Sequence, residues 1–265
     1  MPNADGRHAR HRDAWASLCA WRAERLPWTR FAALALAVAW IAGLGQPFVP
    51  AMAVGRFVLA FTLVVQFRLW DDLVDRERDR TRHPERVMTR SADLGAFVLA
   101  CVGLGLGNVL AMLVLHGAAA AAGLASSSAV LGAWYRLHSG RGFIHAHVLL
   151  LKYPLFALLL SGEATESWTG FPAAAALYSG LCLFEILDSP AGQPLSSRLL
   201  GLHGSVITLA ACWPRLDLAG GAALFAVSLC IALIAHGRLH LPARKYWPLV
   251  AAIIVLVRSS LGDSA

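Results

Sequence analysis

Long runs of apolar residues, repeated along almost the whole chain, limit what this sequence can fold into more than any other feature. Of its 265 residues, 57% are hydrophobic and only 15% are charged, whereas a soluble globular domain has about 25% charged residues. A helix that crosses a bilayer needs about 20 apolar residues. We therefore predict an all-α polytopic membrane helix bundle with about nine transmembrane helices, at about 31–50, 52–70, 94–116, 118–135, 143–161, 170–187, 200–214, 219–237 and 246–260.

The predicted spans also suggest how the chain is organised. The third and fourth spans touch and are separated only near Gly117. Residues 1–27 are rich in Arg and contain no long apolar run, so we expect a cytoplasmic N-terminal extension with a short surface helix that contains Trp15 and Trp21. No chemistry is assigned to this extension. Residues 28–265 form the predicted transmembrane domain.

Basic residues gather on one side of the predicted bundle. Of the 23 Lys and Arg residues, all but Arg56, Lys152, Arg215 and Arg258 fall on the side of the N-terminus if successive spans alternate in direction. Because Lys and Arg accumulate in cytoplasmic loops, we expect a cytoplasmic N-terminus in the inner (plasma) membrane of a bacterium. This orientation also explains the net charge of +7 without nucleic acid as a partner; membrane lipids are the expected surroundings.

Acidic residues concentrate directly after the second apolar segment. If the helix continues past this segment at about 100° per residue, Asp71, Asp72, Asp75 and Asp79 share one face. Like charges at this spacing destabilise a helix, so we expect a counter-ion. Carboxylates together with the oxygens of a substrate phosphate are typical ligands of Mg²⁺, which makes Mg²⁺ the expected cofactor.

A second, smaller acidic group lies near the end of the sixth predicted span. Glu185 and Asp188 are three residues apart and therefore share a helical face. Ionisable groups at this depth are costly and usually face a protein cavity. Both acidic groups fall at the cytoplasmic ends of even-numbered spans, so we expect them to converge on one site that opens to the cytoplasm.

In these residues the chain resembles the UbiA superfamily of intramembrane prenyltransferases. The first motif of that family, Asn-Asp-x-x-Asp-x-x-x-Asp at the end of the second of nine helices, is matched by Asp71, Asp72, Asp75 and Asp79, with Asp71 in place of the usual Asn. The stretch from Arg82 to Arg86 is similar to the loop that follows in the family. In the second motif, the aspartate expected four residues after Asp188 is replaced by Gly192.

The resemblance implies a Mg²⁺-dependent enzyme that transfers an isoprenyl group from an isoprenyl diphosphate to an unknown acceptor, either aromatic or lipid. Basic residues would bind the departing diphosphate, and aromatic rings would stabilise a carbocation. The catalytic residues would be Asp71, Asp72, Asp75, Asp79 and Asp188; the metal ligands Asp71, Asp75, Asp79, Glu185 and Asp188; and the substrate-binding residues Arg68, Tyr135, Arg136, Arg141, Lys152 and Tyr178.

Other interpretations remain open at this point. Arg136 and Arg141 also fit simple orientation signals, and Lys152 also fits a side chain that snorkels to the interface. We interpret His138, His145 and His147 as loop or interface residues. The protein as a whole could be a membrane terpene cyclase of the same architecture, in which the allylic cation closes on its own double bonds. It could also be a non-catalytic membrane or transport protein on this scaffold, although transporters usually show paired internal repeats.

Overall fold

Every regular element in the described part of the chain is an α-helix. The computed structural model describes residues 4–44, 46–91, 93–137, 143–162, 174–175 and 177–182, and no strand occurs among them. The fold prediction is therefore confirmed at the level of an all-α protein. In chain order the helices are α1 (Ala4–Arg25), α2 (Trp28–Ala42), α3 (Pro50–Arg82), α4 (Val87–Arg90), α5 (Gly95–Leu137) and α6 (Phe143–Leu160).

Proline sets three of the helix boundaries. Pro27 separates α1 from α2, Pro50 is the first residue of α3, and Pro84 follows the end of α3. Proline is tolerated in the first turn of a helix, but in the interior it removes a hydrogen bond and clashes with the preceding turn. α2 is only 15 residues long, shorter than the segment 31–50 predicted from hydropathy, because the chain turns at Gly43 and Leu44.

Gly117 interrupts α5. Its backbone angles, φ 86° and ψ 177°, lie in a region that is essentially restricted to glycine. The helix of 43 residues therefore consists of two segments, each about the length that a bilayer core requires. The separation predicted near Gly117 is confirmed.

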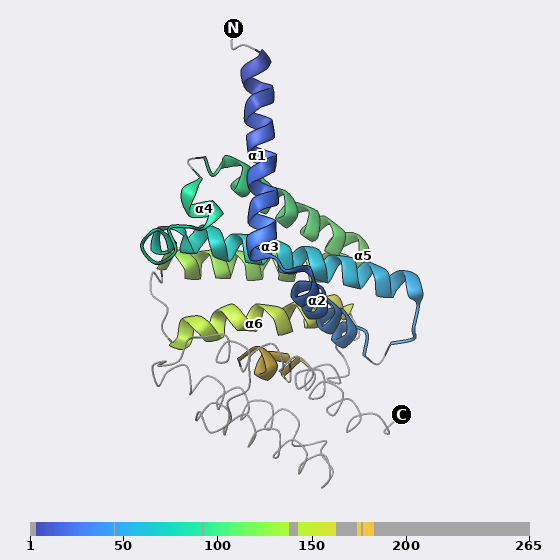
Figure 1. Cartoon of the computed structure of the whole chain (residues 1–265). Helices are drawn as coiled ribbons and strands as arrows, with labels where there is room; N and C mark the ends of the chain where they lie inside the picture. Colours follow the sequence, from blue (N-terminus) through green and yellow to red (C-terminus); the bar gives the residue numbers. More distant parts are fainter. Residues whose placement is uncertain are drawn as a thin grey trace. The chain divides into compact units, whose positions relative to one another are not determined.

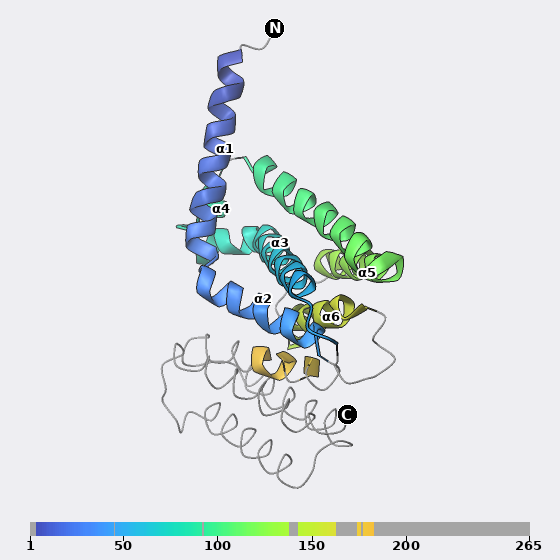
Figure 2. The same ribbon diagram turned by 90° about the vertical axis from the view of Figure 1, so that its right-hand side faces the viewer.

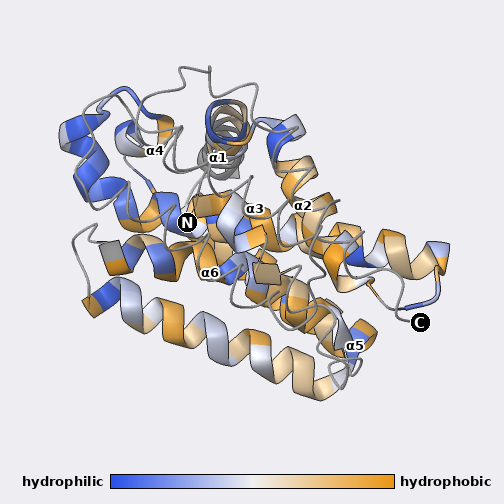
Figure 3. Ribbon diagram, turned by 90° about the horizontal axis from the view of Figure 1, so that it is seen from below, coloured by the Kyte–Doolittle hydropathy of each residue, from blue (hydrophilic) through white to orange (hydrophobic). Residues whose placement is uncertain are grey.

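Among the described residues, two helices, α3 and α5, are long and apolar enough to cross a membrane. Many of their large apolar side chains are exposed, among them Val58 (53%), Leu106 (64%) and Val114 (81%), as a helix surface that contacts lipid requires. Figure 3 shows the hydrophobic colours along α5 and the hydrophilic colours gathered around α4. The count of nine spans stays a prediction, because the segments 200–214, 219–237 and 246–260 lie outside the described residues.

The chain divides into two compact units, Met1–Ala37 with Pro50–Ala125, and Val38–Val49 with Ser126–Ala265. In the first unit, the C-terminal half of α1 lies against α3 and α4, while its N-terminal half extends beyond them (Figures 1 and 2). An apolar cluster joins four helices of this unit: Trp21 of α1, Leu69 of α3, Met88 of α4, and Phe97 and Cys101 of α5.

A polar network connects the apolar parts of α3 and α5. The Asn108 side-chain amide donates to Gln66 Oε1 at 2.7 Å, and the Thr62 hydroxyl donates to Asn108 Oδ1 at 2.6 Å. Gln66 and Asn108 are 6% and 3% exposed. Gly105 allows this approach, because a Cβ atom at that position would lie 3.0 Å from Gln66 Nε2. The network therefore fixes the position of α3 against α5 with uncharged groups.

Candidate active site

The acidic face of α3 is helical, as predicted, but it divides into two pairs. α3 continues through residues 71–82. Asp72 and Asp79, about 20° apart around the helix, are only 5% and 8% exposed. Asp71 and Asp75, about 40° apart, are partly exposed. The two pairs therefore have different surroundings.

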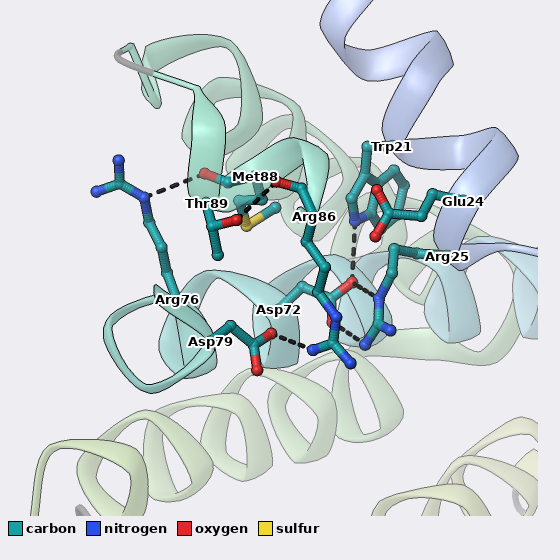
Figure 4. A pocket seen from close by; sticks show the side chains of 9 residues that line it. All are labelled: Trp21, Glu24, Arg25, Asp72, Arg76, Asp79, Arg86, Met88 and Thr89. Carbon is teal, nitrogen blue, oxygen red and sulfur yellow. Dashed lines mark hydrogen bonds and ion pairs between the residues drawn. The ribbon is translucent and has the colours of Figure 1, made fainter. Parts of the chain in front are cut away.

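Asp72 is held by three side chains. Trp21 Nε1 donates to its Oδ2 atom at 2.9 Å, and Arg25 donates to both oxygens, from Nε to Oδ2 at 3.2 Å and from Nη2 to Oδ1 at 2.8 Å (Figure 4). Arg68, one turn earlier on α3, lies with its Nη2 atom 3.3 Å from Oδ1. A carboxylate has about four acceptor positions; the three hydrogen bonds and the ion pair with Arg68 engage both of its oxygens.

The surroundings of Asp72 favour its ionised form. Asp72 lies on the polar end of α3, beyond the apolar part that ends at Trp70. Burial by itself raises the pKa of this carboxyl group, but the charges of Arg68 and Arg25 and the hydrogen bonds from Arg25 and Trp21 outweigh burial and hold the pKa below its usual value. Burial likewise opposes the charge of Arg25, and the hydrogen bond and charge of Asp72 reverse this effect and raise the pKa of Arg25.

The short helix α4 is fixed at both ends by charged side chains. At its start, Glu24 of α1 accepts a hydrogen bond from the backbone N–H of Val87 at 2.8 Å. At its end, Arg76 of α3 donates to the carbonyl oxygens of Met88 (3.2 Å) and Ser91 (2.8 Å). These contacts satisfy backbone groups that a helix leaves unpaired at its ends. They also tie α4 to α1 on one side and to α3 on the other.

Asp79, which was predicted to be a metal ligand, forms an ion pair with Arg86, the residue that precedes α4. Together these groups surround a small pocket, which we call the corner pocket. Its free volume is about 10 Å³, the space of about one water molecule, so in this conformation the side chains leave no room for a larger ligand. The corner pocket is lined by Trp21, Glu24, Arg25, Asp72, Arg76, Asp79, Arg86, Met88 and Thr89.

The predicted metal site is only partly within the described residues. Glu185 and Asp188 lie outside them, as does Arg141. Among the residues that the structure does describe, no group of three or more His, Cys, Asp or Glu side chains is arranged to hold a metal ion. The oxygens of Asp71 and Asp75, one turn apart on a partly exposed face, are of the type that Mg²⁺ prefers, and with substrate and water oxygens they fit such an ion.

The remaining predicted substrate residues belong to the second unit. Tyr135, Lys152 and Tyr178 are buried, with exposed fractions of 8%, 2% and 2%, and Arg136 is exposed. The Lys152 ammonium group lies 5.3 Å from the centre of the Tyr153 ring.

His145 and His147 were interpreted as loop or interface residues, and the loop placement was wrong. Both lie on α6 and are 7% and 9% exposed. Trp134 Nε1 donates to His145 Nδ1 at 3.1 Å, and His147 Nδ1 is hydrogen bonded to the Tyr178 hydroxyl. Each imidazole has one aromatic hydrogen-bond partner, an arrangement that a search for zinc-ligand spacing does not find. His138 lies outside the described residues.

Sequence reasoning missed the contribution of α1 to the acidic site. Trp21 and Arg25 come from the segment to which no chemistry was assigned, and Arg86 comes from the loop that was recognised only by resemblance. A signal was present in the spacing of Leu18, Trp21 and Arg25, which places the three side chains on one helical face. Leu18 packs against the same apolar cluster as Trp21.

Comparison of the chain with family models, with curated proteins and with solved structures found no match.

Proposed function

We propose that the protein is a Mg²⁺-dependent intramembrane prenyltransferase, which transfers an isoprenyl group from an isoprenyl diphosphate to an aromatic or lipid acceptor. One observation carries the proposal: a helix long enough to cross a membrane continues directly into a helical stripe of four aspartates. An isoprenyl diphosphate has an apolar tail and a strongly anionic head. A membrane-spanning helix with an acidic end offers surroundings for both parts, provided that a cation neutralises the diphosphate.

Asp71 and Asp75 are the proposed metal ligands on α3, and Asp79 joins them if its ion pair with Arg86 opens. Glu185 and Asp188 complete the proposed site. When bound there, Mg²⁺ neutralises charge on the leaving diphosphate. The role of the carboxylates is to hold the cation at the end of the apolar span, so that the allylic carbon lies within the span while the phosphates lie outside it.

Arg68 is the described residue best suited to bind the diphosphate. Its Nη2 atom pairs with Asp72, but its buried Nε–H has no hydrogen-bond acceptor among the described residues. A buried donor without an acceptor costs free energy, and an oxygen of a bound phosphate would remove that cost. We propose Arg136, Arg141 and Lys152 as further cations near the diphosphate, and Tyr135 and Tyr178 as rings near the allylic carbon.

Replacing one proposed ligand tests the function directly. The Asp75→Asn variant, purified in nanodiscs and supplied with Mg²⁺, an isoprenyl diphosphate and candidate acceptors, should lose at least about a hundredfold in turnover, because a preorganised charge at the leaving group is removed. Diphosphate release and prenylated product are the readouts. Removing the metal with EDTA should abolish turnover of the wild-type protein, and added Mg²⁺ should restore it.

Glu77→Gln is the matched control. Glu77 lies on the same stretch of α3, but its side chain is 73% exposed and pairs with Arg80 at 2.9 Å, so turnover should stay within about a factor of two of wild type. Equal activity of the Asp75→Asn and wild-type proteins would refute the proposed site. Diphosphate release without any acceptor, with a cyclic hydrocarbon as product, would show that the protein is a membrane terpene cyclase and not a transferase.

A further inference from the structure

The described contacts of α1 with the acidic end of α3 form a narrow stripe. Leu18 and Trp21 pack into the apolar cluster, Arg25 binds Asp72, and Glu24 binds the start of α4. The neighbouring side chains Trp15 and Cys19 are exposed. The described part of α1 is therefore attached along one face only, over about two helical turns.

This attachment engages both carboxylate oxygens of Asp72. Trp21 and Arg25 donate three hydrogen bonds to them, and Arg68 forms an ion pair with Oδ1. A cation could coordinate Asp72 only after at least one donor has left. Arg68 belongs to the same helix as Asp72 and stays within reach of it, whereas Arg25 and Trp21 belong to another helix.

The charge of Arg25 also opposes the binding of a cation. With α1 attached, the guanidinium groups of Arg25 and Arg68 both contact the buried carboxylate of Asp72. The charge of Arg25 opposes the approach of a divalent cation to the adjacent acidic residues of α3. When Arg25 withdraws, Asp72 and Arg68 remain as a neutral pair, and that opposition is reduced.

We propose that α1 is an autoinhibitory latch: Arg25 acts as a built-in counter-ion that competes with a divalent cation at the acidic end of α3, so that attachment of α1 and binding of the cation exclude each other. The identity of the cation rests on the proposed function, but the competition does not depend on prenyl transfer. By linkage, attachment of α1 weakens cation binding by the same factor by which the cation weakens attachment.

The first test measures cation binding without any substrate. Mn²⁺ prefers the same oxygen ligands as Mg²⁺, and its free concentration can be read from its electron paramagnetic resonance signal as purified full-length protein in nanodiscs is added. The Arg25→Met variant, which keeps an unbranched apolar stem, should bind Mn²⁺ about tenfold more tightly than wild type. The Trp21→Phe variant keeps an aromatic ring and removes one donor, so it should bind Mn²⁺ about twofold more tightly.

Arg22→Met is the matched control. It removes the same charge from the same helix, but Arg22 is exposed and its guanidinium lies over the Trp28 ring, 5.1 Å from its centre, away from Asp72. Mn²⁺ affinity should therefore stay at the wild-type value. Equal affinities of the Arg25→Met, Arg22→Met and wild-type proteins would overturn the latch, as would the absence of Mn²⁺ binding in all of them.

The second test measures the latch itself. Cys19 is exposed on α1, whereas Cys101 and Cys182 are buried; with Cys212 and Cys230 replaced by serine, a nitroxide label on Cys19 reports the motion of α1. Added Mg²⁺ should increase the mobility of the label in the otherwise wild-type protein and should have little effect in the Arg25→Met protein, where the label is already mobile. A label that Mg²⁺ leaves unchanged in both would contradict the latch.

These measurements separate the two proposals. Tighter Mn²⁺ binding by the Arg25→Met variant in a protein that turns over no isoprenyl diphosphate would support the latch and reject the proposed function. Turnover that depends on Asp75, with no change of Mn²⁺ affinity in the Arg25→Met variant, would support the proposed function and reject the latch.

Discussion

Two regions of the first unit hold helices together with polar side chains, and they do so differently. In the apolar part of α3, neutral groups connect it to α5 through Thr62, Gln66 and Asn108. At the polar end of α3, charged groups connect it to α1 and to the loop before α4 through Asp72 and Asp79. Charges are costly inside a membrane, so neutral groups suit the first region. In the proposed competition, the second region exchanges an ion pair for a cation, which the neutral groups of the first region cannot do.

The largest effect on the attachment of α1 is expected from the Asp72→Ala variant. It leaves Arg25 and Arg68 without their shared anion. Removing one partner of a buried ion pair costs about 3–5 kcal/mol; we expect about 2 kcal/mol here, because both guanidinium groups retain some exposure and can be rehydrated. Hydrogen exchange of the backbone amides in the second half of α1 should accelerate about thirtyfold.

Asp72→Ala leaves the proposed metal ligands Asp71 and Asp75 in place. Mn²⁺ binding by this variant therefore distinguishes loss of the latch from loss of the proposed metal site. Glu77→Gln is again the control, since an exposed ion pair contributes at most about 1 kcal/mol. Unchanged exchange of α1 in the Asp72→Ala variant would show that the apolar contacts of Leu18 and Trp21 alone hold the helix.

A smaller effect is expected from the neutral network. Asn108→Leu leaves the buried Gln66 amide without its partner, and hydrogen bonds between membrane helices contribute about 0.6 kcal/mol on average and about 1.7 kcal/mol at most. We expect a loss of about 1 kcal/mol in unfolding stability, measured by steric trapping or by denaturation in mixed micelles.

The double variant Gln66→Leu with Asn108→Leu sharpens the comparison. Replacing both partners by apolar groups removes the unsatisfied amide as well as the bond, so it should be closer to wild type than either single variant. If the double variant loses as much unfolding stability as the two single variants together, the network does not act as a unit. A smaller rescue is expected at the charged region, where the guanidinium groups retain some exposure and can be rehydrated after Asp72 is lost.

The smallest expected effect on the attachment of α1 is that of lowering the pH. Because the pKa of Asp72 is lower in the folded protein than its ordinary value of 3.8, its ion pair contributes stability at pH values above about 4 and loses this contribution as the pH falls through the lowered pKa. The mobility of a nitroxide on Cys19 should therefore rise only below about pH 4. A transition near neutral pH would assign the attachment of α1 to another titrating group.

Local patterns in the sequence were sufficient for part of this structure. The spacing of Asp71, Asp75 and Asp79 predicted that the helix continues beyond the apolar segment, and Gly117 marked the break in α5, because both features depend on backbone geometry near those residues. The end of α2 at Ala42 was not predicted, since hydropathy does not detect a turn made of Gly and Leu residues.

The contacts of Asp72 could not be predicted in the same way. Its partner Trp21 lies 51 positions earlier in the chain, and no periodic pattern encodes which side chain meets a given carboxylate across two helices. The separation of the four aspartates into two pairs likewise depends on what packs against each side of α3. Glu185, Asp188 and Arg141 lie outside the described residues, so their part in the site stays a prediction.

The central claim is that the acidic groups of α3 and of the segment around Asp188 hold one cation and one diphosphate. A structure of the full chain with Mn²⁺ and a non-reactive thio analogue of an isoprenyl diphosphate tests it most directly, since Mn²⁺ is located by its anomalous scattering. The account predicts Mn²⁺ in contact with the carboxylates of Asp75 and Asp188 and with the phosphate oxygens. Asp188 at the opposite face of the membrane from Asp75, or a diphosphate bound away from α3, would contradict it.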